Sequence, residues 1–196
     1  MTGKKQFDVG VALDAAMVQF WRAGHAATSV DDLSRATGLN RSSLYSSFGD
    51  KDALYLRCLD RYAERYGHRY DLALSRAAEE PLPAVRAFFD VTLDRIADPD
   101  VPDGCLVAQT AMAAPVLSPA IAARAAEALG FQRARLRTAL TAARLAENTA
   151  DDFAVHLAAV NQSLAVLSRT GASGRHLRTV VDVSVTALAH VVRAGA

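Results

Sequence analysis

The chain has 196 residues, of which 51% are hydrophobic and 22% charged, and its formal net charge is +1. This length and composition indicate a folded, water-soluble protein of one or two domains and exclude an intrinsically disordered chain. Because the net charge is close to zero, any binding to nucleic acid must come from the local placement of charged side chains.

The sequence contains no signal for a membrane segment or for export. No apolar run approaches the roughly 20 residues needed to span a bilayer, and the N-terminus lacks a secretory hydrophobic region. We therefore expect a cytoplasmic protein that makes no membrane contact. The two cysteines, Cys58 and Cys105, have neither metal-ligand spacing nor a disulfide pattern, so we expect free thiols, no metal and no cofactor.

The first predicted elements are a helix over residues 9–23 and a short helix after it. Apolar residues recur at helical spacing through 9–23, and Gly24 can end that helix. Ser29 is a good N-cap, and Asp32 three residues later makes a variant of the capping box. Gly38 supplies a left-handed stop, so the second helix has only about two turns.

A second short helix follows directly. Asn40 can cap it, and it contains Leu44, Tyr45 and Phe48. Two short helices joined by a tight turn containing glycine are the sequence form of a helix-turn-helix. The apolar residues expected to hold the pair together are Leu33, Ala36, Leu39, Leu44 and Phe48.

The rest of the chain reads as further helices without convincing strands. Their expected ranges are 50–76, 83–97, 104–114, 118–147 with a weak point at Gly130, 150–170 and 175–193. We therefore predict an all-α fold of about nine helices. A helix-turn-helix domain over 1–51 would precede a helical effector-binding and dimerisation domain over 52–196.

The long helix over 50–76 carries a row of arginines at intervals of four residues. These are Arg57, Arg61, Arg65 and Arg69. Since Asp60 and Glu64 are interleaved with them, we interpret the row as a solvated face stabilised by pairs along the helix.

Residues 9–55 resemble the DNA-binding domain of TetR/AcrR-type transcriptional regulators. The resemblance rests on the ordered segments "GHAATSV", "ATGL" and "SLYSSFGDKDAL" at tight spacing. It implies a helix-turn-helix that reads operator DNA, a homodimer, a body of further helices and a small-molecule effector. Such a protein would be a regulator, most simply a repressor, and not an enzyme. No acid–base pair or activated nucleophile is visible to support catalysis.

The N-terminal residues of a recognition helix contact base edges in the major groove. Here they are Arg41, Ser42 and Ser43, and Arg41 can bond bidentately to guanine. Hydroxyl groups and an ammonium would contact phosphates. The candidates for these phosphate contacts are Thr28, Ser29, Tyr45 and Lys51. Ser29 and Asn40 can also be explained as helix caps alone.

Two further sets of candidates lie in the helical body. Apolar stripes on the last two helices fit a four-helix dimer interface, as the resemblance implies, although such stripes also form ordinary core. The interface candidates are Leu157, Val160, Leu164, Val181, Val185 and Leu188. The effector-pocket candidates are Tyr62, Tyr66, Phe88, Phe89, Gln109, Thr110, Phe131 and His156, any of which can instead be core.

Cys105 leaves two interpretations open. It lies at the start of the helix "GCLVAQTAMAA", where amide groups favour a thiolate that could sense oxidants or electrophiles. A buried thiol that behaves as a small apolar residue also explains it, since free cysteines are usually buried. The alternatives to a ligand-responsive repressor are thus a thiol-based repressor acting through Cys105, or a helical binding protein without DNA activity.

Overall fold

The computed structural model describes residues 7–194. In this range the chain forms nine α-helices, one short 3₁₀ helix and no strand, so the predicted all-α fold is confirmed. The helices are α1 (Val9–Ala27), α2 (Val30–Thr37), α3 (Arg41–Phe48), α4 (Lys51–Leu74), α5 (Pro81–Ala97), α6 (Leu106–Met112), η1 (Ala114–Val116), α7 (Pro119–Ala142), α8 (Glu147–Arg169) and α9 (Gly174–Ala194).

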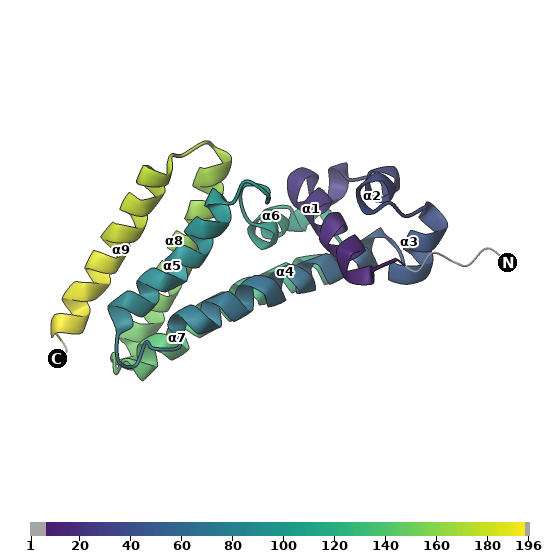
Figure 1. Ribbon diagram of the computed structural model, residues 1–196. Coiled ribbons are helices and arrows are strands. Elements are labelled where there is room, and N and C mark those ends of the chain that lie inside the picture. Colours follow the sequence, from purple (N-terminus) through teal and green to yellow (C-terminus); the bar gives the residue numbers. More distant parts are fainter. Residues whose placement is uncertain (1–6, 195–196) are drawn as a thin grey trace.

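The helices are arranged as a small head and a larger body. Figure 1 shows α1, α2 and α3 at one end, with α4 running from them into the body. Within the body α7 packs along α4 and α8, while α5 packs on α4 and α9. The short α6 packs against α1, α4 and α7, between head and body. None of the helices described is long and apolar enough to cross a membrane.

Local capping fixes the helix-turn-helix as the sequence predicts. Ser29 and Asp32 form a reciprocal capping box at the start of α2. Gly38 ends α2 in the left-handed conformation, with φ of 70°. The Asn40 side chain accepts a 2.8 Å hydrogen bond from the Ser43 amide and begins α3. Leu33 and Leu44 are buried between the helices, whereas Ala36 is exposed and does not contribute as expected.

Two helices end differently from their predicted ranges. Gly24 interrupts α1 as predicted, since its φ of 79° and ψ of 169° are not helical, and a short helical piece continues beyond this kink to Ala27. The helix expected over 118–147 stops at Ala142, and Arg144 takes a left-handed φ of 62° in the turn that follows. Gly130 is no weak point, since α7 runs through it without a break.

The arginine row on α4 is not a self-paired solvated face. Arg61 and Arg65 donate hydrogen bonds of 2.9 and 2.7 Å to Asp14 on α1. Asp60, one of their expected partners, instead pairs with Arg124 on α7. The arginines therefore stabilise packing between helices, and the Asp14 cluster fastens the head to α4.

The Asp14 cluster makes part of the stability depend on pH. Hydrogen bonding by Arg61, together with Arg65, holds the pKa of Asp14 below its ordinary 3.8, although burial opposes this. A depressed carboxyl pKa contributes stability that is present above pH 3.8 and is lost as the pH falls through the folded-state value. We expect Asp14→Asn to lower the free energy of unfolding by about 0.5–1 kcal/mol at pH 7.

The difference in unfolding free energy between wild type and Asp14→Asn should shrink toward zero as the pH falls below 3.8. Urea unfolding at a series of pH values measures it. Asp152→Asn, at an exposed position on α8, is the matched control. A difference for Asp14→Asn that stays constant across this range would contradict the ion-pair explanation.

Candidate nucleic-acid interface and cavity

The third helix is anchored by two apolar side chains and presents polar ones to solvent. Leu44 and Phe48 are buried, and the Arg57 guanidinium lies 4.9 Å from the centre of the Phe48 ring. The opposite face is solvated. Arg41, Ser42 and Tyr45 are exposed on it, while Ser43 is half-buried beside the cap. The expected base-reading residues therefore share one accessible surface at the end of the head.

Arg41 is held in a bidentate pair. Its Nε and Nη2 donate hydrogen bonds of 2.9 and 2.7 Å to the two carboxylate oxygens of Asp31 on α2. Hydrogen bonding by Arg41 keeps the pKa of Asp31 below its ordinary value. The same fork of donors matches the O6 and N7 acceptors of guanine. The arginine is thus oriented at the surface, but its donors are occupied by an acidic neighbour that the sequence reading overlooked.

Three other residues expected to contact phosphate make hydrogen bonds within the chain. Thr28 is buried, and its hydroxyl donates a 2.6 Å hydrogen bond to the Gly24 carbonyl, so its position does not support a phosphate contact. The Ser29 hydroxyl serves the capping box with Asp32. Lys51 Nζ donates to the carbonyls of His25 and Thr28, both at 3.2 Å. Lys51 therefore braces the start of α4 against the turn between α1 and α2.

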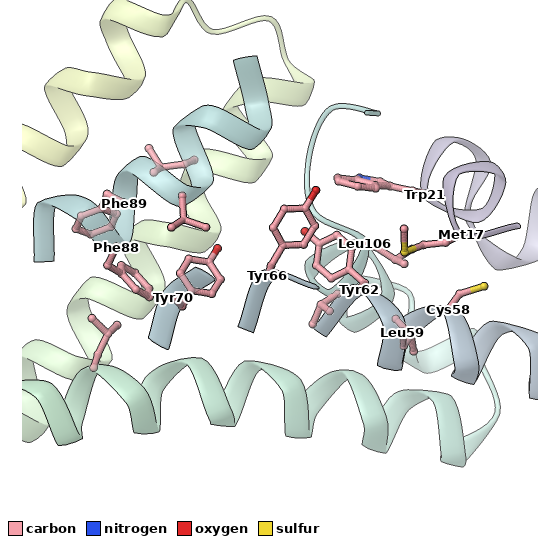
Figure 2. Close-up of a cluster of buried hydrophobic side chains, with 14 of the residues drawn as sticks. Met17, Trp21, Cys58, Leu59, Tyr62, Tyr66, Tyr70, Phe88, Phe89 and Leu106 are labelled. Atoms are coloured by element: carbon pink, nitrogen blue, oxygen red, sulfur yellow. The ribbon is translucent and has the colours of Figure 1, made fainter. Parts of the chain in front are cut away.

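A cavity of about 410 Å³ lies between α4 and α7. Three expected residues, Tyr62, Tyr66 and Phe131, line it, as does Cys105. Figure 2 shows Tyr62, Tyr66 and Tyr70 projecting from α4, with Trp21 of α1 nearby. Its walls also include residues absent from the sequence expectation, namely Val107, Leu129, Gln132 and Gln162. This volume is typical of small-molecule pockets.

The remaining pocket candidates lie elsewhere. Phe88 and Phe89 are fully buried in the core, where Phe88 packs on Tyr70 with ring centres 4.7 Å apart (Figure 2). Thr110 is buried and shares a 2.7 Å hydrogen bond with the Tyr55 hydroxyl. Gln109 lines a separate small hollow against α8, and His156 is exposed on α8. The structure does not bring these five residues into the cavity between α4 and α7.

Two ion pairs join α7 to α4 at the edge of the cavity. Arg124 pairs with Asp60, and Arg135 Nε donates a 2.6 Å hydrogen bond to Asp71. Gly67 leaves room for the Arg135 guanidinium, because a Cβ there would lie 2.9 Å from Arg135 Nη2. Both guanidinium groups are therefore committed to carboxylates, which leaves an aromatic and amide-lined space between them.

The expected dimer stripe faces inward in the protomer. Five of its six residues, Leu157, Leu164, Val181, Val185 and Leu188, are buried, and Val160 is half-buried. They pack α8 and α9 against their own core. The opposite faces of these helices carry exposed apolar side chains. These are Val155 and Val166 on α8 and Val183 on α9.

The chain thus combines a capped helix-turn-helix, with an exposed arginine at the start of α3, and an all-helical body that contains a cavity. This is the architecture of helix-turn-helix transcriptional regulators. Comparison of the sequence with known families gives the particular group. Residues 12–58 match the description "Bacterial regulatory proteins, tetR family". Residues 81–183, more than half of the chain, match the C-terminal domain of LmrA/YxaF-like transcriptional regulators. The chain belongs to the TetR family.

Individual relatives agree with this assignment. The chain is 35% identical over 103 residues to the transcriptional repressor ComR of Escherichia coli and 29% identical over 115 residues to the uncharacterised regulator YezE of Bacillus subtilis. These matches cover 53% and 57% of this chain, and 49% and 57% of the relatives. The chain thus spans about half the length of the curated relatives it matches. A cysteine-substituted variant of the TetR-family regulator CifR, solved with 26-base-pair operator DNA, superposes with a TM-score of 0.80 at 27% identity. That similarity covers 93% of this chain and 98% of CifR.

Proposed function

We propose that the chain is a cytoplasmic transcriptional repressor that binds a palindromic operator as a homodimer and is released by a small-molecule effector. The observation that carries this proposal is the exposed N-terminal face of α3, where the Arg41 fork is oriented at the end of the head. The operator complex of CifR, which shares this fold over nearly its whole length, supports the same mode of binding.

In this proposal Arg41, Ser42 and Ser43 face base edges, and Tyr45 reaches a phosphate. Lys51 contributes charge near the backbone while bracing α4, because an ammonium has three donors and two are used internally. Ser29 caps the start of α2 and thereby positions that helix. The buried Thr28 hydroxyl stabilises the turn between α1 and α2 through its hydrogen bond to the Gly24 carbonyl. Arg41 must exchange Asp31 for guanine when the head enters the major groove.

This exchange leads to a prediction for Asp31. We expect Asp31→Asn to raise operator affinity several-fold, since it frees the Arg41 fork and removes a negative charge beside the phosphates. Fluorescence anisotropy with labelled operator measures the affinity. Asp103→Asn, exposed in the loop before α6, is the control. A loss of affinity in Asp31→Asn would mean that the pair orients Arg41 for binding and does not compete with DNA.

Contacts of α4 and α6 provide a route from the cavity to the head. Tyr62 and Tyr66 of α4 line the cavity, and the same helix carries the arginines that hold Asp14 of α1. Gln109 Nε2 of α6 donates a 3.4 Å hydrogen bond to the Phe20 carbonyl of α1. A ligand that prefers one position of α4 and α6 would thereby change the spacing of the two heads, and so the affinity for the operator.

The dimer would form through the outward faces of α8 and α9. Val155, Val166 and Val183 give these faces an apolar surface that is not used within the protomer. Two copies related by a two-fold axis could pack them as a four-helix bundle. Pairing is needed because one head makes few base contacts, whereas two heads read both halves of a palindrome.

The test is a salt titration of binding to DNA from either side of the chain's own gene. We expect specific binding in the nanomolar range, with a steep decrease in affinity as salt rises. A random fragment of equal length is the control. Equal affinity for all fragments would contradict the proposal and favour a helical binding protein without DNA activity.

A further inference from the structure

Gln132 and Gln162 form a polar pair in the lining of the cavity between α4 and α7. Gln132 lies on α7 and is 9% exposed, and Gln162 lies on α8 and is half-buried. Nε2 of Gln162 donates a hydrogen bond to Oε1 of Gln132. Among residues 7–194 neither side-chain amide makes another hydrogen bond, so the amino group of Gln132 and the carbonyl oxygen of Gln162 are free. Polar groups inside a protein are normally paired, and here a bound molecule can pair them.

The pair presents one donor and one acceptor whichever way the two amides are turned. A side-chain amide donates through its nitrogen and accepts through its oxygen. When one amide donates to the other, a nitrogen is left on one side chain and an oxygen on the other. The complement of this pair is a molecule that has a carbonyl oxygen next to an N–H. A lactam, which is an amide within a ring, holds these two groups side by side in a fixed geometry.

Four aromatic side chains line the same cavity. Tyr62, Tyr66 and Tyr70 come from α4 at intervals of four residues, and Phe131 comes from α7 (Figure 2 shows the three tyrosines). The ring centres of Tyr62 and Tyr66 are 4.7 Å apart. Aromatic side chains contact a flat ring over a large area, through edge-to-face or offset stacking. The lining therefore favours a fused aromatic ring system over an open chain.

Two ion pairs of equal spacing frame the cavity. Asp60 and Asp71 lie eleven residues apart on α4, and their partners Arg124 and Arg135 lie eleven residues apart on α7. Eleven residues of an α-helix span about 16 Å, so the space between the pairs has room for several fused rings. The small residues that line the cavity between them are Ala63, Gly67 and Ala128.

The charges of the lining disfavour anions. Arg124 and Arg135 both donate hydrogen bonds to carboxylates, so neither is free to receive a negative ligand. Glu64 also lines the cavity, and within the part of the chain that the structure describes it forms no ion pair. A carboxylate entering beside Glu64 would be repelled without gaining a cation. An uncharged molecule meets no such barrier.

We propose that the cavity binds uncharged fused aromatic lactams. The ligand carbonyl accepts a hydrogen bond from Gln132, the ring N–H donates to Gln162, and the rings lie against the aromatic side chains of α4. The role of such a lactam as effector rests on the function proposed above, whereas its binding does not. The ligand joins α7 and α8 to α4, the helix whose arginines hold Asp14 of α1, so its binding favours one position of α4 beneath the head.

The experiment measures binding of 2-quinolinone, an uncharged bicyclic lactam, to the full-length chain by isothermal titration calorimetry without DNA. We expect one site per chain. N-Methyl-2-quinolinone keeps the carbonyl but lacks the N–H, so it should bind at least about tenfold more weakly, because the Gln162 oxygen is left unpaired. Uracil has the same two groups on a single polar ring, and it should also bind at least about tenfold more weakly, because it buries less apolar surface.

Two variants of similar side-chain size test the glutamine pair. Gln162→Met should weaken 2-quinolinone binding about tenfold and abolish the preference over the N-methyl compound, since the acceptor for the N–H is gone. Gln132→Met should weaken both compounds about two- to tenfold and keep the preference. Gln19→Met is the control, because Gln19 is half-buried on α1 and outside the cavity lining. No binding of 2-quinolinone, or a preference unchanged in both variants, would overturn the proposal.

A charged probe tests the selection against anions. We expect 2-oxo-1,2-dihydroquinoline-4-carboxylate, the same lactam with a negative charge, to bind wild type at least about tenfold more weakly than 2-quinolinone. Asp71→Asn releases Arg135 from its carboxylate partner, so it should raise the affinity for this anion several-fold. Equal affinity of wild type for the two lactams would contradict the restriction to uncharged ligands.

A DNA readout separates binding from regulation. Because calorimetry is performed without DNA, a chain that binds no operator still tests the lactam site. If operator binding is specific, we expect 2-quinolinone to release the operator from wild type, and about tenfold more of it to be needed for Gln162→Met. Release at the same concentration from both proteins, or from neither, would overturn the effector role.

Discussion

Arg41→Ala is expected to weaken operator binding by the dimer at least about 30-fold. Each bidentate contact between arginine and guanine discriminates by about 1–3 kcal/mol. Two half-sites therefore lose about 2–6 kcal/mol, or roughly 30-fold to 10⁴-fold. The variant should also distinguish the operator from a random fragment less well, because a base contact is lost in addition to a charge. Anisotropy titrations with both DNA fragments measure affinity and discrimination together.

Two comparisons test the geometry behind this expectation. Arg41→Lys keeps the charge but loses the planar fork, so it should retain non-specific binding and lose most of the discrimination. Arg133→Ala removes an exposed arginine of α7 and should leave DNA binding unchanged. Since Arg41 pairs with Asp31 at the surface, its replacement should barely change the unfolding free energy. Unchanged discrimination in Arg41→Ala would mean that α3 does not read bases through this residue.

The head was predictable because local signals determine it. The caps of α2 and α3 depend on contacts within a few residues. In the structure Ser29 and Asn40 begin these helices as N-caps, and Gly38 ends α2. The resemblance in residues 9–55 then correctly indicated the family. Thr28 shows where such reasoning ends. Its hydroxyl was expected to contact a phosphate, but it is buried and donates to the carbonyl of Gly24 at the kink of α1.

The body was predicted only in outline, since periodicity identifies a buried face but not what covers it. Tyr62 and Phe88 both lie on apolar stripes, yet Tyr62 lines the cavity while Phe88 packs in the closed core. In the same way the regular stripe on α9 is buried against α5 and α8, whereas Val183 on the outer face of α9 is exposed. Which helices meet is a long-range property that a single helix does not encode.

The burial of Arg95 could have been predicted from the sequence, although it was not. Arg95 lies three and seven residues after Thr92 and Phe88, on the stripe that faces the core of α5. A charged residue at such a position needs a partner or a function. What the sequence could not supply was the neighbour, because the Gly104 carbonyl that accepts a hydrogen bond from Arg95 lies in the loop before α6.

Val183→Glu is expected to convert the dimer to monomers. Val183 is 66% exposed on the outer face of α9, so a glutamate there should leave the protomer folded. In the proposed interface, two carboxylates would be brought out of water next to an apolar surface near a two-fold axis, which strongly opposes association. Loss of the second head should weaken operator binding at least about 100-fold. Sedimentation equilibrium and anisotropy measure the two effects.

The matched controls distinguish the outer from the inner face of α9. Val116→Glu places the same charge at a valine that is 78% exposed on η1, and it should leave the dimer intact. Leu188→Ala removes a fully buried side chain of the inner stripe, and it should lower the unfolding free energy by about 2–5 kcal/mol. If Val183→Glu remains a dimer, the outward face of α9 is not the interface. Because Leu188 packs within its own protomer, its effect on stability should persist even in the Val183→Glu monomer.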